Sequence, residues 1–166
     1  MKQITQIDLT TLAQQAQASP RLRANHNLHE QLGDPIQRLA IAMEPGTYVR
    51  PHRHPQTWEL LYPLKGRFVV LNFDELGRVT ERRVLGEECA VLENPANGWH
   101  AVLSLDEGAV IFEVKHGPYQ AIAPQDYTEW SPAEGEPGVE ALMAWYSQAQ
   151  IGDVYPVATQ ASNPAN

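Results

Sequence analysis

The sequence contains few cysteines and few basic residues. Its single cysteine, Cys89, cannot form a disulfide within the chain, which fits a reducing compartment. Lysine and arginine together number 12 against 20 aspartate and glutamate residues, and the formal net charge is −8. Because nucleic-acid-binding proteins and partners of anionic membranes need a basic surface, this balance argues against both classes. A few local arginines can still hold a small anionic ligand.

Targeting and membrane-spanning signals are also absent. The first residues have no apolar signal-peptide region, and no run of about 18 apolar residues occurs. We therefore expect a cytoplasmic protein. At 166 residues, the chain is long enough for one domain with its own core and short for two.

The central part of the sequence has the pattern of an all-β domain. Short apolar runs alternate with turn residues at intervals of about ten. Eight strands are predicted, near residues 36–43, 47–54, 58–64, 67–73, 78–84, 88–93, 99–104 and 109–115. Strands of this spacing predict a single-domain antiparallel sandwich, barrel or jelly roll over residues 36–120.

Shorter segments flank this predicted barrel. Residues 1–35 are expected to form a helical and strap-like segment packed on it, with a short helix ending before Pro20. Residues 121–150 are expected to form a loop and a short helix, because apolar residues recur at helical spacing over 139–149. Residues 151–166 are small and polar and are expected to be a flexible tail.

The strongest chemical feature is a cluster of metal-ligand residue types, His52, His54 and Glu59, within eight residues. Side chains two apart in a strand share a face, so the two imidazoles can grip one ion from one side. Glu59 follows a short break and can return toward the same ion on the next strand. A fourth candidate ligand, His100, lies on a later predicted strand. Imidazole and carboxylate predict one divalent transition metal, with zinc, iron, manganese and nickel all open.

Other polar residues are predicted to face the same interior. Tyr48 and Arg50 share the expected face of the histidines. An arginine inside a barrel is costly unless paired, so Arg50 either anchors a carboxylate or phosphate of the substrate or pairs with Glu113. Glu113 and Lys115 lie on one face of the last predicted strand, and apolar residues lie on its other face. A polar inner face indicates a water-filled cavity. For Lys115 alone, we favour exposure to solvent.

The ligand cluster resembles the first motif of the cupin proteins. The matching residues, at the motif's spacing, are Gly46, His52, His54, Glu59 and Gly66. Pro95-Ala-Asn-Gly98-Trp-His100 resembles the second cupin motif with altered spacing, and Ser104 stands where an asparagine often follows. Cupins are small β-barrel or jelly-roll proteins whose motifs bring three histidines and a glutamate to one metal. The resemblance implies that His52, His54, Glu59 and His100 are metal ligands.

Further segments resemble the WbuC family of cupin-fold metalloproteins, from about residue 21 to about residue 135. They are Arg23-Ala-Asn25-His-Asn27-Leu-His29, Gln37-Arg38, Trp58-Glu-Leu-Leu, Phe73-Asp74, Phe112-Glu-Val-Lys-His-Gly-Pro-Tyr119 and Trp130-Ser-Pro. The family's name comes from bacterial surface-polysaccharide (O-antigen) gene clusters, which implies a link to O-antigen biosynthesis. Gln125 stands where the family would have a lysine.

The resemblance also bears on ligand binding. It makes Arg23, Asn25, Asn27 and His29 candidates for a strap over the cavity mouth that faces a ligand, with a solvated loop as the alternative, and Tyr119 can reach the mouth as well.

Two classes of function follow from these features. The first is a metal-dependent enzyme acting on a small polar, sugar-like or anionic substrate, in which Glu113 or Tyr48 moves a proton during isomerisation, epimerisation or dehydration. Oxygen chemistry on non-haem iron is a variant of this class. The second is a non-catalytic module that binds or senses a carbohydrate or small acid. Pairing of two copies through an edge strand would make a homodimer.

Overall fold

The computed structural model describes residues 1–156, and residues 157–166, with most of the predicted flexible tail, lie outside it. The elements along the chain are α1 (Gln6–Ala18), β1 (Arg23–Asn27), β2 (Ile36–Met43), β3 (Glu59–Lys65), β4 (Phe68–Phe73), β5 (Val79–Leu85), β6 (Leu92–Asn94), β7 (Trp99–Ser104), β8 (Ala109–His116), the short 3-10 helix η1 (Pro124–Asp126) and α2 (Val139–Gln148).

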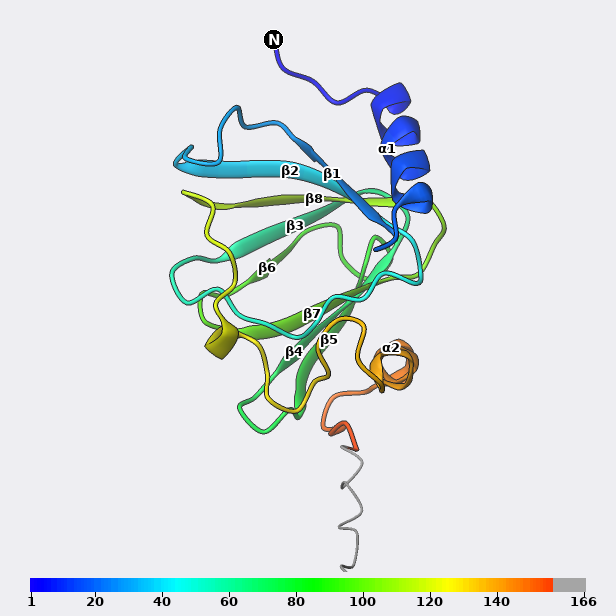
Figure 1. Ribbon diagram of the computed structural model, residues 1–166, viewed down its shortest axis with the longest axis vertical. Helices are drawn as coiled ribbons and strands as arrows, with labels where there is room; N and C mark the ends of the chain where they lie inside the picture. Colours follow the sequence, from blue (N-terminus) through cyan, green and yellow to red (C-terminus); the bar gives the residue numbers. More distant parts are fainter. Residues whose placement is uncertain (157–166) are drawn as a thin grey trace, which may run out of the picture.

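The strands form two antiparallel sheets that face each other as a jelly roll (Figure 1). The five-stranded sheet has the order β1-β2-β8-β3-β6, and the three-stranded sheet has the order β5-β4-β7. Neighbours in the larger sheet are distant in sequence: Gln37 of β2 pairs with Lys115 of β8, which in turn pairs with Glu59 of β3. This register brings polar residues from three strands into one row. The predicted all-β, jelly-roll fold class is confirmed.

One predicted strand is absent, and one strand forms where none was predicted, for different physical reasons. The segment 47–54 is not a strand, and only His52 forms isolated bridges, to His100 and Tyr127. Pro51 and Pro55 lack the backbone N–H that a continuous ladder requires. By contrast, β1 lies within the stretch predicted as a helical strap, and the sheet therefore begins at Arg23. As a polar edge strand, β1 shows no apolar alternation in sequence.

Each sheet is covered on its outer face by one helix (Figure 1). Helix α1 begins with a capping box, in which the Thr5 hydroxyl accepts from the Asp8 N–H and the Asp8 carboxylate accepts from the Thr5 N–H. The apolar contacts between α1 and the five-stranded sheet involve Leu9, Leu12, Ala16, Ala40, Ala42 and Val110. The helix therefore lies on the outward side chains of β2 and β8.

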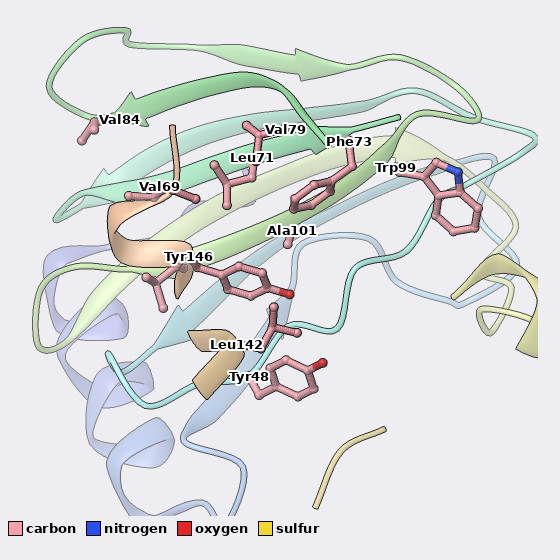
Figure 2. Packing of buried hydrophobic residues seen from close by; sticks show 12 residues of the cluster. Tyr48, Val69, Leu71, Phe73, Val79, Val84, Trp99, Ala101, Leu142 and Tyr146 are labelled. Carbon is pink, nitrogen blue, oxygen red and sulfur yellow. The ribbon is translucent and has the colours of Figure 1, made fainter. Parts of the chain in front are cut away.

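Helix α2 packs on the outer face of the three-stranded sheet, as Figure 2 shows. Its buried residues Leu142 and Tyr146 contact a cluster that includes Leu71 and Phe73 of β4. Burying an aliphatic side chain of this size contributes about 1.5–3 kcal/mol. The predicted short helix over 139–149 is confirmed. No helix within residues 1–156 is long and apolar enough to cross a membrane.

Between the sheets, the barrel interior has two halves of different chemistry. One half is a packed group of apolar side chains, which we call the apolar floor. Its members are Met43, Leu61, Phe68, Val70, Leu85, Val102, Ala109 and Ile111. The other half is a cavity of about 740 Å³, which we call the main cavity. Four of these apolar residues, Met43, Leu61, Val102 and Ile111, also line the main cavity, so the apolar floor forms part of its wall.

Candidate metal centre

Three histidines meet at the inner wall of the main cavity. His52 and His54 come from the irregular segment between β2 and β3, and His100 comes from β7. Their ligand atoms all lie within 4.8 Å of one another, and all three side chains are buried. A pair of backbone hydrogen bonds holds the two segments together, because the His52 N–H donates to the His100 carbonyl (3.0 Å) and the His100 N–H donates to the His52 carbonyl (2.9 Å). The chain therefore positions these imidazoles through a local bridge.

Backbone carbonyls orient two of the imidazoles. His52 Nδ1 donates to the Arg50 carbonyl at 2.8 Å, and His100 Nδ1 donates to the Gly98 carbonyl at 2.9 Å. A carbonyl can only accept, so we assign the proton of each neutral ring to Nδ1. This tautomer leaves Nε2 with a free lone pair, as a metal ligand requires.

Glu59 completes the cluster from the start of β3. Its Oε1 lies 3.3 Å from His54 Nε2, and its Oε2 lies 3.1 Å from His100 Nε2. Neither Nε2 atom has a hydrogen bond of acceptable geometry to any residue in 1–156, although both are buried. A buried nitrogen without a hydrogen bond is energetically unfavourable. A cation bound between the imidazoles and the carboxylate would interact with both nitrogens and remove this cost. The residues therefore fit a divalent transition metal, while Glu59 as fourth ligand stays a prediction.

The charges in this cluster depend on one another. Burial, and secondly the neighbouring His100, holds the pKa of His52 well below its ordinary value. Burial also opposes charge on His100, but the Glu59 carboxylate outweighs it and raises the pKa of that imidazole. Burial disfavours charge on Glu59 as well, yet His100 keeps its pKa well below the usual value. The buried Glu59 carboxylate thus favours a positive charge beside it, which a protonated His100 or a bound cation can supply.

Beyond the histidines, the main cavity has a polar mouth. Arg23, Asn25 and Asn27 alternate along β1 and line the cavity, together with His29 and Tyr119. The side chain of His29 is only 5% exposed, and its Nδ1 lies 2.9 Å from the Arg38 carbonyl and 3.0 Å from the Arg38 N–H. Its Nε2 has no partner in the described chain. The structure thus brings five of the six predicted ligand-facing residues to the main cavity, Arg50 being the exception, and their role in binding stays a prediction.

Lys115 and Glu113 extend from β8 into the same cavity. The Lys115 ammonium lies 2.6 Å from Glu113 Oε1 and 3.3 Å from Glu59 Oε1. The expectation that Lys115 is solvent-exposed is therefore wrong, because two buried carboxylates draw its ammonium inward. Burial, and secondly the charge of Glu59, raises the pKa of Glu113 to about 7, against the opposing effect of Lys115. Glu113 thus titrates near neutrality.

Tyr48 and Arg50 do not line the main cavity with the three histidines as predicted, because the segment that carries them is not a strand; they line a smaller neighbouring cavity together with only His52 of the three. The Tyr48 ring packs near α2 (Figure 2), and its hydroxyl donates to the Pro132 carbonyl at 2.8 Å. Burial raises its pKa to about 12. Arg50 donates to Ser131 Oγ (3.0 Å), the Thr128 carbonyl (3.1 Å) and the Ser131 carbonyl (3.0 Å). The expected pair of Arg50 with Glu113 is therefore not formed.

Two cavity residues have no assigned role in the sequence argument. Gln37 is buried on β2, and its Nε2 donates to the Asp34 carbonyl at 2.8 Å. A polar residue at an inward position of an apolar strand is the signal that would find it. Tyr127 follows η1 and lies with its ring centroid 6.3 Å from that of His52. It belongs to no periodic pattern, so sequence reasoning has no means of placing it.

Comparison with known proteins agrees with this architecture. A family model described as a domain of unknown function (DUF6016) matches residues 4–85. No curated protein matches the sequence. Among solved structures, oxalate oxidase in complex with the substrate analogue glycolate has 18% identity and a TM-score of 0.50, over 64% of this chain and 56% of that chain.

Two further structures superpose over more of the chain. The protein TT1209 from Thermus thermophilus has 19% identity and a TM-score of 0.51, over 70% of this chain and 97% of that chain. The protein BH2720 from Bacillus halodurans has 15% identity and a TM-score of 0.51, over 74% and 86% of the two chains. At these identities the likeness shows the fold alone. The protein has a single-domain cupin fold whose three buried histidines can bind a metal.

Proposed function

We propose that the protein is a metal-dependent enzyme that acts on a small, hydroxylated, sugar-like substrate. The observation that carries this proposal is the convergence of three imidazoles and one carboxylate on the wall of a cavity of about 740 Å³. A ligand-sized cavity beside a buried metal site is what a catalytic centre needs, whereas a purely structural site is closed.

The polar groups of the cavity suit hydroxyl groups. A sugar hydroxyl both donates and accepts a hydrogen bond, and the amides of Asn25 and Asn27 offer both functions at the mouth. His29, which lines the same cavity, has a buried Nε2 atom that no described residue satisfies. A substrate hydroxyl bonded to this nitrogen would remove the cost of leaving it buried and unpaired.

Glu113 is the group best suited to move a proton. Its pKa near 7 leaves both protonation states populated at neutral pH, which general acid–base catalysis requires. The Lys115 ammonium at 2.6 Å fixes the carboxylate in the cavity.

A bound divalent ion would supply Lewis-acid polarisation of a substrate oxygen. Proton transfer next to a polarised carbonyl favours isomerisation, epimerisation or dehydration. Tyr48 has no part in this proposal, because its hydroxyl is bonded elsewhere.

The biological setting is proposed from the sequence resemblance. The segments similar to the WbuC family include β1 and the end of β8, and both line the main cavity. This supports a substrate from bacterial surface-polysaccharide (O-antigen) biosynthesis, where hydroxylated sugars are the common chemistry.

Proton exchange with solvent tests the enzyme proposal directly. Metal-loaded protein is incubated in D2O with a panel of reducing sugars and sugar acids, with and without a phosphate group, and followed by proton NMR. We expect carbon-bound deuterium in at least one sugar, abolished in Glu113→Gln and retained in Glu107→Gln, an exposed carboxylate outside the cavity. Binding of a sugar without exchange or conversion would favour the non-catalytic module. Absence of any binding would contradict the proposed function.

A further inference from the structure

A second cavity, of about 250 Å³, adjoins the candidate metal centre, and we call it the side cavity. Its wall includes His52, which also faces the main cavity. Arg21, Arg23 and Tyr127 likewise line both spaces. A ligand group in the side cavity would therefore lie next to the metal site.

Three guanidinium groups surround the side cavity, although the whole protein has a formal net charge of −8. They belong to Arg21, Arg23 and Arg50. Among the described residues that line the cavity, Glu134 is the only carboxylate. Its two oxygens accept from Arg21 Nε at 2.6 Å and Arg21 Nη2 at 2.5 Å. Glu134 is thus occupied by Arg21, and the other two guanidiniums keep their charges.

Arg23 has neither a hydrogen bond nor an ion pair to any residue between 1 and 156 through its guanidinium. Its side chain projects from the first position of the edge strand β1, half-buried and facing both cavities. Burial, and secondly the like charge of Arg21, lowers its pKa. A partly desolvated charge without a partner is costly, and such groups are usually kept for a ligand.

Arg50 is held rigidly but is not neutralised. Its Nε and Nη2 atoms donate only to neutral oxygens, those of Thr128 and Ser131. Its Cζ lies 5.0 Å from the centroid of the Tyr127 ring, which further fixes the plane of the guanidinium. These contacts leave Nη1 without a hydrogen bond to the described chain. Arg50 is therefore a pre-oriented positive charge.

We propose that the side cavity binds the phosphate group of a phosphate monoester ligand, whose remaining part extends to the candidate metal centre. A phosphate monoester carries about two negative charges at neutral pH, which matches the two uncompensated guanidiniums, whereas a carboxylate carries one. Guanidinium binds phosphate through two parallel hydrogen bonds, and Arg23 has its donors free for this geometry. The assignment rests on the proposed function, since it makes the sugar-like substrate a phosphorylated one.

Inorganic phosphate is the probe for this subsite, in calorimetric titrations in phosphate-free buffer. Five proteins are compared: wild type, Arg23→Gln, Arg23→Lys, the matched control Arg83→Gln and His54→Ala. Arg83 lies on β5, pairs with Glu81 and lines neither cavity.

We expect Arg23→Gln to weaken phosphate binding by roughly 10- to 100-fold, as loss of a charged hydrogen-bond donor does. Arg83→Gln should bind as wild type does. Arg23→Lys keeps the positive charge but lacks the two parallel N–H donors of a guanidinium. Its affinity for phosphate should lie between those of wild type and Arg23→Gln.

The His54→Ala protein separates this inference from the metal site. Phosphate binding that survives in His54→Ala and weakens in Arg23→Gln supports the side cavity, even if no sugar is ever turned over. Binding that disappears in His54→Ala and persists in Arg23→Gln would place the anion on the metal and overturn the inference, while leaving the metal centre intact. Equal affinity for acetate and phosphate, or no binding by wild type at millimolar phosphate, would also overturn it.

Discussion

The apolar floor and the main cavity are built from the same strands and share part of their wall, yet only the cavity contains charged side chains. Along β8, Ala109 and Ile111 belong to the floor, while Glu113 and Lys115 face the cavity. Along β7, Val102 lies in the floor and His100 belongs to the metal cluster. All these side chains point to the inside of the barrel, because residues two apart in a strand share a face.

The strands direct alternate side chains into the barrel, and the polarity of those side chains determines whether a region is packed core or polar cavity. The floor supplies stabilising burial, and the cavity holds groups that are costly to bury, including two carboxylates beside an ammonium. Such groups are kept at functional sites because a ligand or cofactor offsets their cost. Substitutions in the two halves should therefore have separate effects on folding and on binding.

The largest effect on stability is expected in the floor. Phe68 has 0% exposure, and Phe68→Ala should lower the free energy of unfolding by about 3–5 kcal/mol, because it removes apolar burial and leaves a cavity. Urea denaturation followed by circular dichroism measures this change. The fraction that stays folded should bind metal as wild type does. A loss below about 1 kcal/mol would show that the floor is not the stabilising half.

A smaller effect is expected from Glu113, and it depends on pH. The folded-state pKa of about 7 lies above the ordinary value, so this carboxyl contributes stability that is fully present below its unfolded pKa and lost as pH rises through about 7. Wild-type protein treated with chelator should therefore lose stability between about pH 5 and 8, by on the order of 2 kcal/mol, relative to Glu113→Gln.

Denaturation midpoints across this pH range provide the measurement. Glu107→Gln, which removes an exposed carboxylate, should follow the wild-type curve. If stability varies with pH in the same way for wild type and Glu113→Gln, Glu113 does not titrate with a raised pKa. That result would contradict the proposed role of Glu113 in proton transfer.

The smallest of these effects concerns Tyr48, which lines the side cavity but whose hydroxyl is bonded to the protein backbone. Tyr48→Phe removes one hydrogen bond, to the Pro132 carbonyl, and should cost about 1 kcal/mol of stability. Metal content and sugar turnover should stay unchanged, as judged by elemental analysis and the NMR assay. A large fall in turnover with normal stability would restore Tyr48 as a catalytic residue.

Sequence reasoning predicts the strands that carry the apolar floor and the grouping of the three histidines, because each has a local signal. Strands β4 and β7 have near-continuous apolar runs, and the histidines stand at motif spacing. The geometric argument for His52 and His54 is nevertheless wrong, since they lie on an irregular segment and not on a strand. Their positions come from the backbone bridge between His52 and His100, which depends on contact between residues distant in sequence.

The parts that sequence does not predict depend on tertiary contacts. In sequence, Lys115 has the pattern of a surface lysine. Only the pairing of β8 with β3 places it beside Glu59. Strand β1 is recognised only because β2 supplies its partner. Arg50 and Tyr127 meet across a long stretch of chain, and no local pattern encodes their contact. Local periodicity thus finds the apolar elements, while the polar site requires the assembled sheets.

Elemental analysis tests the central claim most directly. Untagged wild type is purified without added metal beside His54→Ala, with Glu107→Gln as a control. His54 is the ligand to remove, because its imidazole makes no hydrogen bond to the backbone in the described structure, whereas His52 and His100 do. Near-stoichiometric transition metal in wild type and in the control, lost in His54→Ala with unchanged circular dichroism, is the predicted result. Metal-free wild type that also fails to take up zinc, iron, manganese or nickel on reconstitution would contradict the account.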